Sequence, residues 1–254
     1  SVLNDKSLHS SEKPRNSGFR NTLAFIHYKG IGFGWHKGNR WWGPGIHSSL
    51  QMTNNTQAFP AQIIGTIKEI RLGSFGLYGL YTFTKINEES GTQAKYFTSI
   101  NGQLSWYGPF VLSLGFSRNY LTGGMKLSGG YQWTEKDAKN IIFEGIFIKN
   151  LVDEEYTVGG HDMFDQTLSG YASLIFPNKG LKLYVEIGQN DNRMHFADFL
   201  SQPDHSMATI IGVRNYGNSN MSKNFVFGFE WTNLMISYTS RHRGSSGSVA
   251  WYSR

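Results

Sequence analysis

The feature that most constrains the fold is an alternation of apolar and polar residues that recurs along the chain. In the stretch LKLYVEIGQ, residues 181–189, leucine, valine and isoleucine alternate with lysine, tyrosine, glutamate and glycine. Residues 110–117 and 225–231 repeat the alternation with phenylalanine, leucine and tryptophan. Successive side chains of a β-strand point to opposite faces of a sheet, so each stretch predicts a strand with one apolar face. The chain is therefore expected to be all-β.

The alternation predicts about fourteen strands, many of them joined by short turns that contain glycine or proline. The predicted strands are residues 19–29, 31–37, 64–73, 77–86, 94–106, 109–120, 124–134, 139–149, 166–176, 180–190, 205–216, 222–231, 234–243 and 247–254. Longer polar connections fall at 86–93, 150–165 and 190–204. Most predicted strands are near the ~9–11 residues that a tilted strand needs to cross a bilayer. Short turns at one end and long loops at the other are typical of outer-membrane barrels.

The composition favours a barrel in lipid. Charged residues make up 17% of the chain, aromatic residues 15%, and the mean hydropathy is −0.38, whereas soluble domains carry about 25% charged residues. A membrane barrel keeps a polar average because only alternate residues face lipid. The sequence has no apolar run of the ~18 residues that a transmembrane helix needs.

A soluble antiparallel sandwich or a lipocalin-like barrel would alternate in the same way. Membrane barrels differ in carrying aromatic girdles at both interfaces. The aromatic residues expected near strand ends are Trp106, Tyr107, Tyr131, Trp133, Trp231, Tyr238, Trp251 and Tyr252. We therefore predict one domain, residues 1–254, that forms a transmembrane antiparallel β-barrel of the bacterial outer membrane.

The stretch GNRWWGPG, residues 38–45, interrupts the alternation. Pro44 has no N–H to donate and the glycines beside it tolerate positive φ, so the chain is expected to leave the sheet here. The residues that follow are rich in Asn, Gln, Ser and Thr, whose polar groups cannot face lipid unpaired. Residues 38–60 are therefore expected to fold into the lumen or onto the rim, and partly to plug the barrel.

This same segment carries a resemblance to a known family. The supporting residues are Asn39 to Gly45 (NRWWGPG), Ser49-Leu50, Asn54-Asn55 and Pro60, followed more weakly by Glu186 and Asp191, by Asp198 to His205, and by Arg214. With these residues the chain resembles the Wzi-like capsule-assembly family of outer-membrane β-barrels.

The resemblance implies a barrel of the Gram-negative cell envelope, with up to about eighteen strands in the full chain, that anchors capsular or other surface polysaccharide as a lectin. It implies no catalysis. Expected partners are the polysaccharide, outer-membrane lipid and other envelope proteins. The family has further sequence before its tryptophan motif, so this sequence is expected to be the C-terminal portion of a longer chain.

Two interpretations of the tryptophan segment stay open. Arg40, Trp41, Trp42, Asn54 and Asn55 are candidate ligand-binding residues, because a tryptophan ring stacks on a sugar and an arginine pairs with an acidic group. The alternative is structural, with the tryptophans anchoring the rim and the asparagines packing the plug.

Charges on the polar side of predicted strands form a second set. They are Lys68, Lys126, Lys182, Glu186, Arg214 and Arg243. We expect them to pair across a filled lumen and to have a structural role.

Other functions have less support in the sequence. The chain has no cysteine, no nucleophile elbow, no zinc signature and no P-loop, so neither a catalytic or metal site nor a cofactor is predicted. A net charge of +6 is expected to be surface charge, with no nucleic-acid partner. A passive porin or a structural component of an outer-membrane complex is the main alternative. An outer-membrane lipid hydrolase built on Ser240 and His242 is a weaker one, since neither residue has a partner acid.

Overall fold

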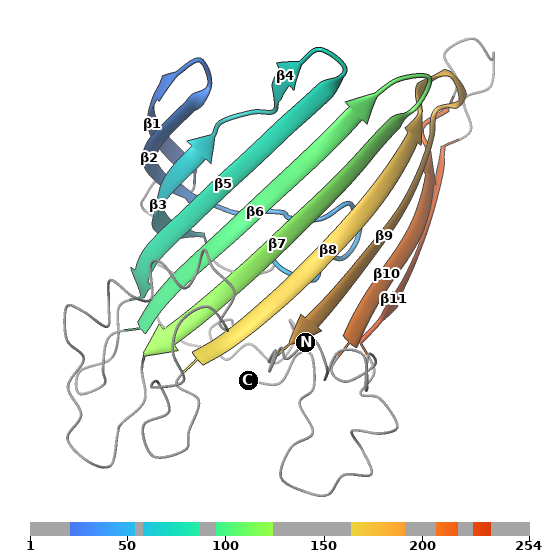
Figure 1. The fold of residues 1–254 in the computed structure, drawn as a ribbon. Helices are drawn as coiled ribbons and strands as arrows, with labels where there is room; N and C mark the ends of the chain where they lie inside the picture. Colours follow the sequence, from blue (N-terminus) through green and yellow to red (C-terminus); the bar gives the residue numbers. More distant parts are fainter. Residues whose placement is uncertain are drawn as a thin grey trace, which may run out of the picture.

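The computed structural model of the 254-residue chain describes residues 21–53, 58–86, 95–123, 164–190, 207–217 and 226–234. These residues form one antiparallel sheet of eleven strands (Figure 1). The strands are β1 (Thr22–Tyr28), β2 (Ile31–Gly38), β3 (Phe59–Thr66), β4 (Ile70–Leu72), β5 (Phe75–Ile86), β6 (Lys95–Tyr107), β7 (Val111–Gly123), β8 (Phe164–Phe176), β9 (Leu181–Asn190), β10 (Met207–Asn215) and β11 (Phe227–Asn233). A short 3₁₀ turn, η5 (Pro177–Lys179), joins β8 to β9.

The strand order follows the chain, as in a series of hairpins. It runs β1-β2-β3-β5-β6-β7-β8-β9-β10-β11, and β4 pairs with β5 beside this path. The predicted all-β class and antiparallel pairing are confirmed. Within the described ranges β1 and β11 are the two edges of the sheet, and no pairing joins them into a closed barrel. No helix in the described part of the chain is long and apolar enough to cross a membrane.

One predicted strand is wrong. Residues 64–73 do not form a continuous strand, because β3 ends at Thr66 and β4 begins only at Ile70. Gly65 has φ +143°, and the Thr66 hydroxyl then bonds the backbone of Gly79 on β5. This local distortion ends the pairing, and the true strand extends instead back to Phe59.

The break between the predicted strands 222–231 and 234–243 is also wrong, because Thr232 and Asn233 both lie in β11 and pair with β10. Their cross-strand partners are Ile210 and Thr209. The predicted strands 124–134, 139–149 and 247–254, and nearly all of 234–243, lie outside the described residues.

The two faces of the sheet have opposite chemistry. One face, here called the apolar face, exposes large apolar side chains, including Phe33 (61%), Leu114 (51%) and Phe229 (62%). The other, here called the polar face, buries small hydroxyl and amide side chains, and the buried ones include Thr82, Ser99, Asn101, Ser105, Ser117 and Ser169. A water-soluble protein buries apolar groups and exposes polar ones, so this distribution is inverted.

Short turns join several pairs of neighbouring strands at one end of the sheet. At the end here called the short-turn end, residues 29–30, 73–74, 108–110 and 177–180 join β1 to β2, β4 to β5, β6 to β7 and β8 to β9. At the opposite end the described strands are separated in sequence by residues 39–58, 87–94, 124–163 and 191–206, most of which lie outside the described residues. The short turns predicted at one end are thus observed, while β10 and β11 are separated at that end by residues 216–226.

Candidate functional site

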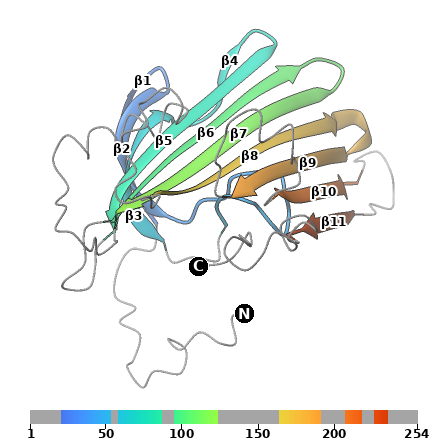
Figure 2. The ribbon, with the colours of Figure 1, turned by 60° about the horizontal axis from the view of Figure 1, so that its bottom comes forward.

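Residues 39–53, here called the crossing segment, run from the end of β2 over the polar face to β11 and back towards β3. Figures 1 and 2 draw this segment in blue behind the central strands, on the side towards which the sheet curves. Its only described strand-like contact is one antiparallel bridge between Trp42 and Met52. The irregular path predicted for residues 38–60 is thus observed over the described part of that range, although Gly38 still belongs to β2 and residues 59–60 to β3.

A carboxylate on β11 holds the tip of the crossing segment. Glu230 accepts hydrogen bonds from the backbone N–H groups of Ile46 (2.7 Å), His47 (3.2 Å) and Ser48 (2.8 Å). The Tyr184 hydroxyl on β9 donates a fourth (2.6 Å). Successive backbone N–H groups make an anion-binding concavity. Here the concavity is occupied by a side chain of the same protein.

A second carboxylate, Glu186 on β9, lies under the middle of the segment. Its side chain is fully buried and lies against Ser169 and the backbone of Leu50. A Cβ atom at Gly43 would stand 2.5 Å from Oε2 of Glu186, and Gly43 has φ +125°. Only glycine adopts this conformation without strain and leaves room for the carboxylate.

Further polar contacts attach the segment to β7, β8 and β9. Lys182 donates to the backbone carbonyl of Pro44 (2.9 Å). Gln51 accepts a hydrogen bond from the Thr167 hydroxyl (2.8 Å), and its carbonyl accepts one from Asn119 (3.4 Å). The segment is therefore attached at several points along its length.

A small apolar cluster lies between the segment and the sheet. Leu50 packs with Tyr184, Ala208 and Ile210, and Ile46 covers the cluster. The crossing segment thus covers a small apolar core on the polar face.

Arg40 is buried, with 5% of its surface exposed. Its guanidinium donates to the carbonyls of His36 (3.1 Å) and Gly38 (3.4 Å) and lies 4.8 Å from the centre of the Phe59 ring. Burial lowers its pKa, because desolvation disfavours the charged form. These contacts support the structural interpretation of Arg40, since they hold the guanidinium on the end of β2.

The two adjacent tryptophans have different environments. Trp42 is buried (6% exposed), and its carbonyl accepts a hydrogen bond from Ser49. Trp41 is only partly buried, and its indole N–H donates to the carbonyl of Gly45 (3.1 Å). Of the two rings, Trp41 therefore retains more surface for a ligand.

The remaining predicted site residues divide into two groups. Asn54, Asn55, Lys126, Arg243, Ser240 and His242 lie outside the described residues. Lys182, Glu186 and Arg214 lie on the polar face as predicted, but Lys182 donates to a carbonyl instead of a carboxylate, and the Arg214 guanidinium lies 4.6 Å from the Tyr216 ring. The prediction for Lys68 is wrong, because Lys68 lies exposed in the connection between β3 and β4.

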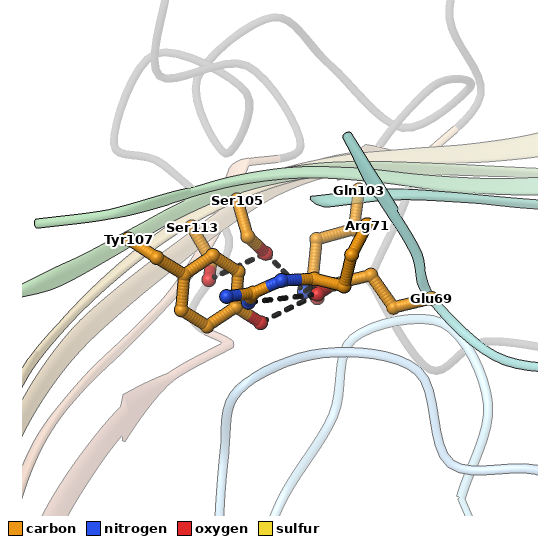
Figure 3. Close-up of polar contacts among 6 residues, drawn as sticks. All are labelled: Glu69, Arg71, Gln103, Ser105, Tyr107 and Ser113. Carbon is orange, nitrogen blue, oxygen red and sulfur yellow. Dashed lines mark hydrogen bonds and ion pairs between the residues drawn. The ribbon is translucent and has the colours of Figure 1, made fainter. Parts of the chain in front are cut away.

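A separate polar cluster lies at the short-turn end (Figure 3). Glu69 pairs with Arg71 (3.6 Å) and accepts hydrogen bonds from Tyr107 (2.5 Å) and Gln103 (3.5 Å). The Arg71 guanidinium stacks 3.1 Å from the centre of the Tyr107 ring, and Ser105 extends the network to Gln103 and to Ser113 on β7. Burial alone would raise the pKa of Glu69, but the hydrogen bonds and the charge of Arg71 lower it overall.

Sequence reasoning missed Glu230 and the Glu69 cluster. Glu230 could have been found, because it alternates with Phe229 and Trp231 and so must point to the polar face. Its backbone partners in the crossing segment, 182 or more positions away, leave no local signal.

No three His, Asp or Glu side chains gather as a metal site within the described ranges. Comparisons with protein-family models, with curated proteins and with solved structures gave no match to this chain.

Proposed function

We propose that the protein is a non-enzymatic outer-membrane β-barrel that binds surface polysaccharide, in the manner of the Wzi-like capsule-assembly family that its sequence resembles. The observation that carries the membrane part is the inverted burial. Side chains such as Phe33, Leu114 and Phe229 are more than half exposed on the apolar face, while serine and threonine are buried on the other. A hydrocarbon environment makes such a face favourable, since it removes the apolar groups from water.

The crossing segment supports a plugged lumen. It lies on the polar face, towards which the sheet curves (Figure 2), and Glu230, Lys182 and Thr167 attach it. A passive porin needs this space open. We therefore favour an anchor over a porin.

The polysaccharide part rests on the resemblance and on the partial exposure of Trp41. An indole ring offers a stacking face to a sugar. Arg40 and Trp42 are buried and would support Trp41 from below, so we assign direct glycan contact to Trp41 and a supporting role to its neighbours.

Glycan arrays and planar bilayers test the proposal. Detergent-solubilised protein is expected to retain acidic capsular polysaccharide, Trp41→Ala to lose most of this retention, and Trp41→Phe to keep part of it. Wild-type protein is expected to show almost no ion conductance. Steady conductance without glycan retention would support the porin instead, and turnover of a fluorogenic phospholipid would support a lipid hydrolase.

A further inference from the structure

The short-turn end of the sheet has an excess of positive charge among the described residues. The exposed cationic side chains there are Lys29, Lys68, Arg71 and Lys179. The described acid at this end is Glu69, which is already paired with Arg71. The three lysines lie in three different connections, so their charge is spread along the rim instead of forming a pocket.

Aromatic and aliphatic side chains lie next to these cations. Tyr28 is 78% exposed, and the Lys29 ammonium lies 5.4 Å from the centre of its ring. Trp106 and Phe110 meet edge to face at 5.1 Å near the β6–β7 turn, and Leu72 is 65% exposed. Aromatic rings and long cationic side chains share the headgroup level of bilayers, where each has an apolar body and a polar tip.

We propose that the short-turn end binds the headgroups of anionic phospholipids, with Lys29, Lys68 and Lys179 facing the lipid phosphates. This inference rests on the membrane insertion proposed above. Basic residues next to a membrane-spanning segment attract anionic lipid, and the charge at this end is complementary to it. Short turns of outer-membrane barrels face the periplasm, where the leaflet consists of phospholipid, so the occupant is phospholipid and not lipopolysaccharide.

The test compares two double variants with the same change in net charge. Lys29→Gln with Lys179→Gln removes two cations from the short-turn end. Lys37→Gln with Lys85→Gln removes two from the opposite end, where β2 and β5 finish. Each folded protein is incubated in detergent with equal amounts of phosphatidylglycerol and phosphatidylcholine, and the lipids that remain bound after purification are counted by mass spectrometry.

Wild-type protein is expected to retain about fivefold more phosphatidylglycerol than phosphatidylcholine. The preference should fall to near equality in the short-turn variant and persist in the opposite-end variant. Equal retention of both lipids by wild-type protein would overturn the inference and leave the membrane proposal standing. A preference that both variants lose equally would also overturn it.

A parallel sample also contains lipopolysaccharide. If the lipopolysaccharide displaces the bound phosphatidylglycerol, the choice of phospholipid as the occupant is wrong. If the protein binds no lipid and stays monodisperse without detergent, the proposed membrane insertion itself is wrong.

Discussion

The Glu230 carboxylate connects two parts of the chain that are far apart in sequence. It satisfies three successive backbone N–H groups of the crossing segment, at Ile46, His47 and Ser48, and a tyrosine hydroxyl. Hydrogen bonds to a charged group contribute more than neutral ones. The attachment of the segment therefore depends strongly on one residue.

Replacing Glu230 with alanine should lower the free energy of unfolding by about 2–3 kcal/mol, because the N–H groups lose their acceptor. Glu230→Gln keeps one acceptor oxygen and should cost less. Urea unfolding in detergent micelles measures both variants. Equal stability of wild type and Glu230→Ala would show that the carboxylate does not hold the segment.

At Gly43 we expect a substitution to be costly for two separable reasons. Gly43→Ala would place a side chain at φ +125° and bring Cβ to 2.5 Å from Glu186, at a cost of about 1–3 kcal/mol. A double-mutant cycle with Glu186→Ala separates the two contributions. If the collision matters, the double variant loses less stability than the sum of the single ones. Full additivity would assign the whole cost to the backbone.

Glu69 predicts a dependence of stability on pH. Its pKa in the folded protein lies below the ordinary value of 4.5, so the unfolded state binds its proton first as the pH falls. The stability from this group is therefore complete above pH 4.5 and is lost as the pH falls through the lowered pKa. In acid titrations followed by thermal melting, Glu69→Gln should be less stable than wild type at neutral pH, and the difference should shrink below the lowered pKa. A difference that stays constant across this range would contradict the assignment.

At the scale of single strands, a substitution in β7 tests whether the apolar face contacts lipid or water. Leu114 lies on the apolar face and is 51% exposed, and its cross-strand partners are Leu104 and Ala172. In a bilayer Leu114→Arg should cost about 2–4 kcal/mol, because a charge on the lipid side of a strand is destabilising. On a water-exposed face the same change should lie within about 0.5 kcal/mol. Unfolding from lipid vesicles distinguishes the two.

A strand could be predicted from the sequence when nearby residues determine it, and could not when contacts with distant residues do. β9 follows directly from the alternation in LKLYVEIGQ, and the turn before it from proline, asparagine and glycine. The break between β3 and β4 could not be predicted, since it depends on a positive φ at Gly65 and a bond from Thr66 to another strand.

The candidate site was predictable only in outline. Gly43-Pro44-Gly45 indicated that the chain leaves the sheet, and the polar composition that follows indicated the polar side. The residues that receive the segment, Glu230 and Thr167 among them, are set by the curvature of eleven strands, which no local pattern encodes.

At the scale of the whole molecule, the inverted faces and the crossing segment require each other. A sheet with buried serine and threonine needs polar contents on its inner side, and the segment supplies backbone and amide groups there. A sheet with exposed phenylalanine and leucine is stabilised when an apolar environment covers those side chains, and the proposed bilayer supplies one. Together they support the proposal of a filled barrel wall, on whose rim the proposed capsule binding would lie.

Fluorescence quenching by brominated lipid acyl chains tests the central claim most directly. Trp231 lies on the apolar face and is 48% exposed, while Trp42 in the crossing segment is 6% exposed. Two proteins are compared, each keeping one of these tryptophans with all others replaced by phenylalanine. We expect strong quenching of Trp231 and little of Trp42 after reconstitution. If Trp231 is quenched no more than Trp42, the apolar face does not contact hydrocarbon and the membrane barrel is wrong.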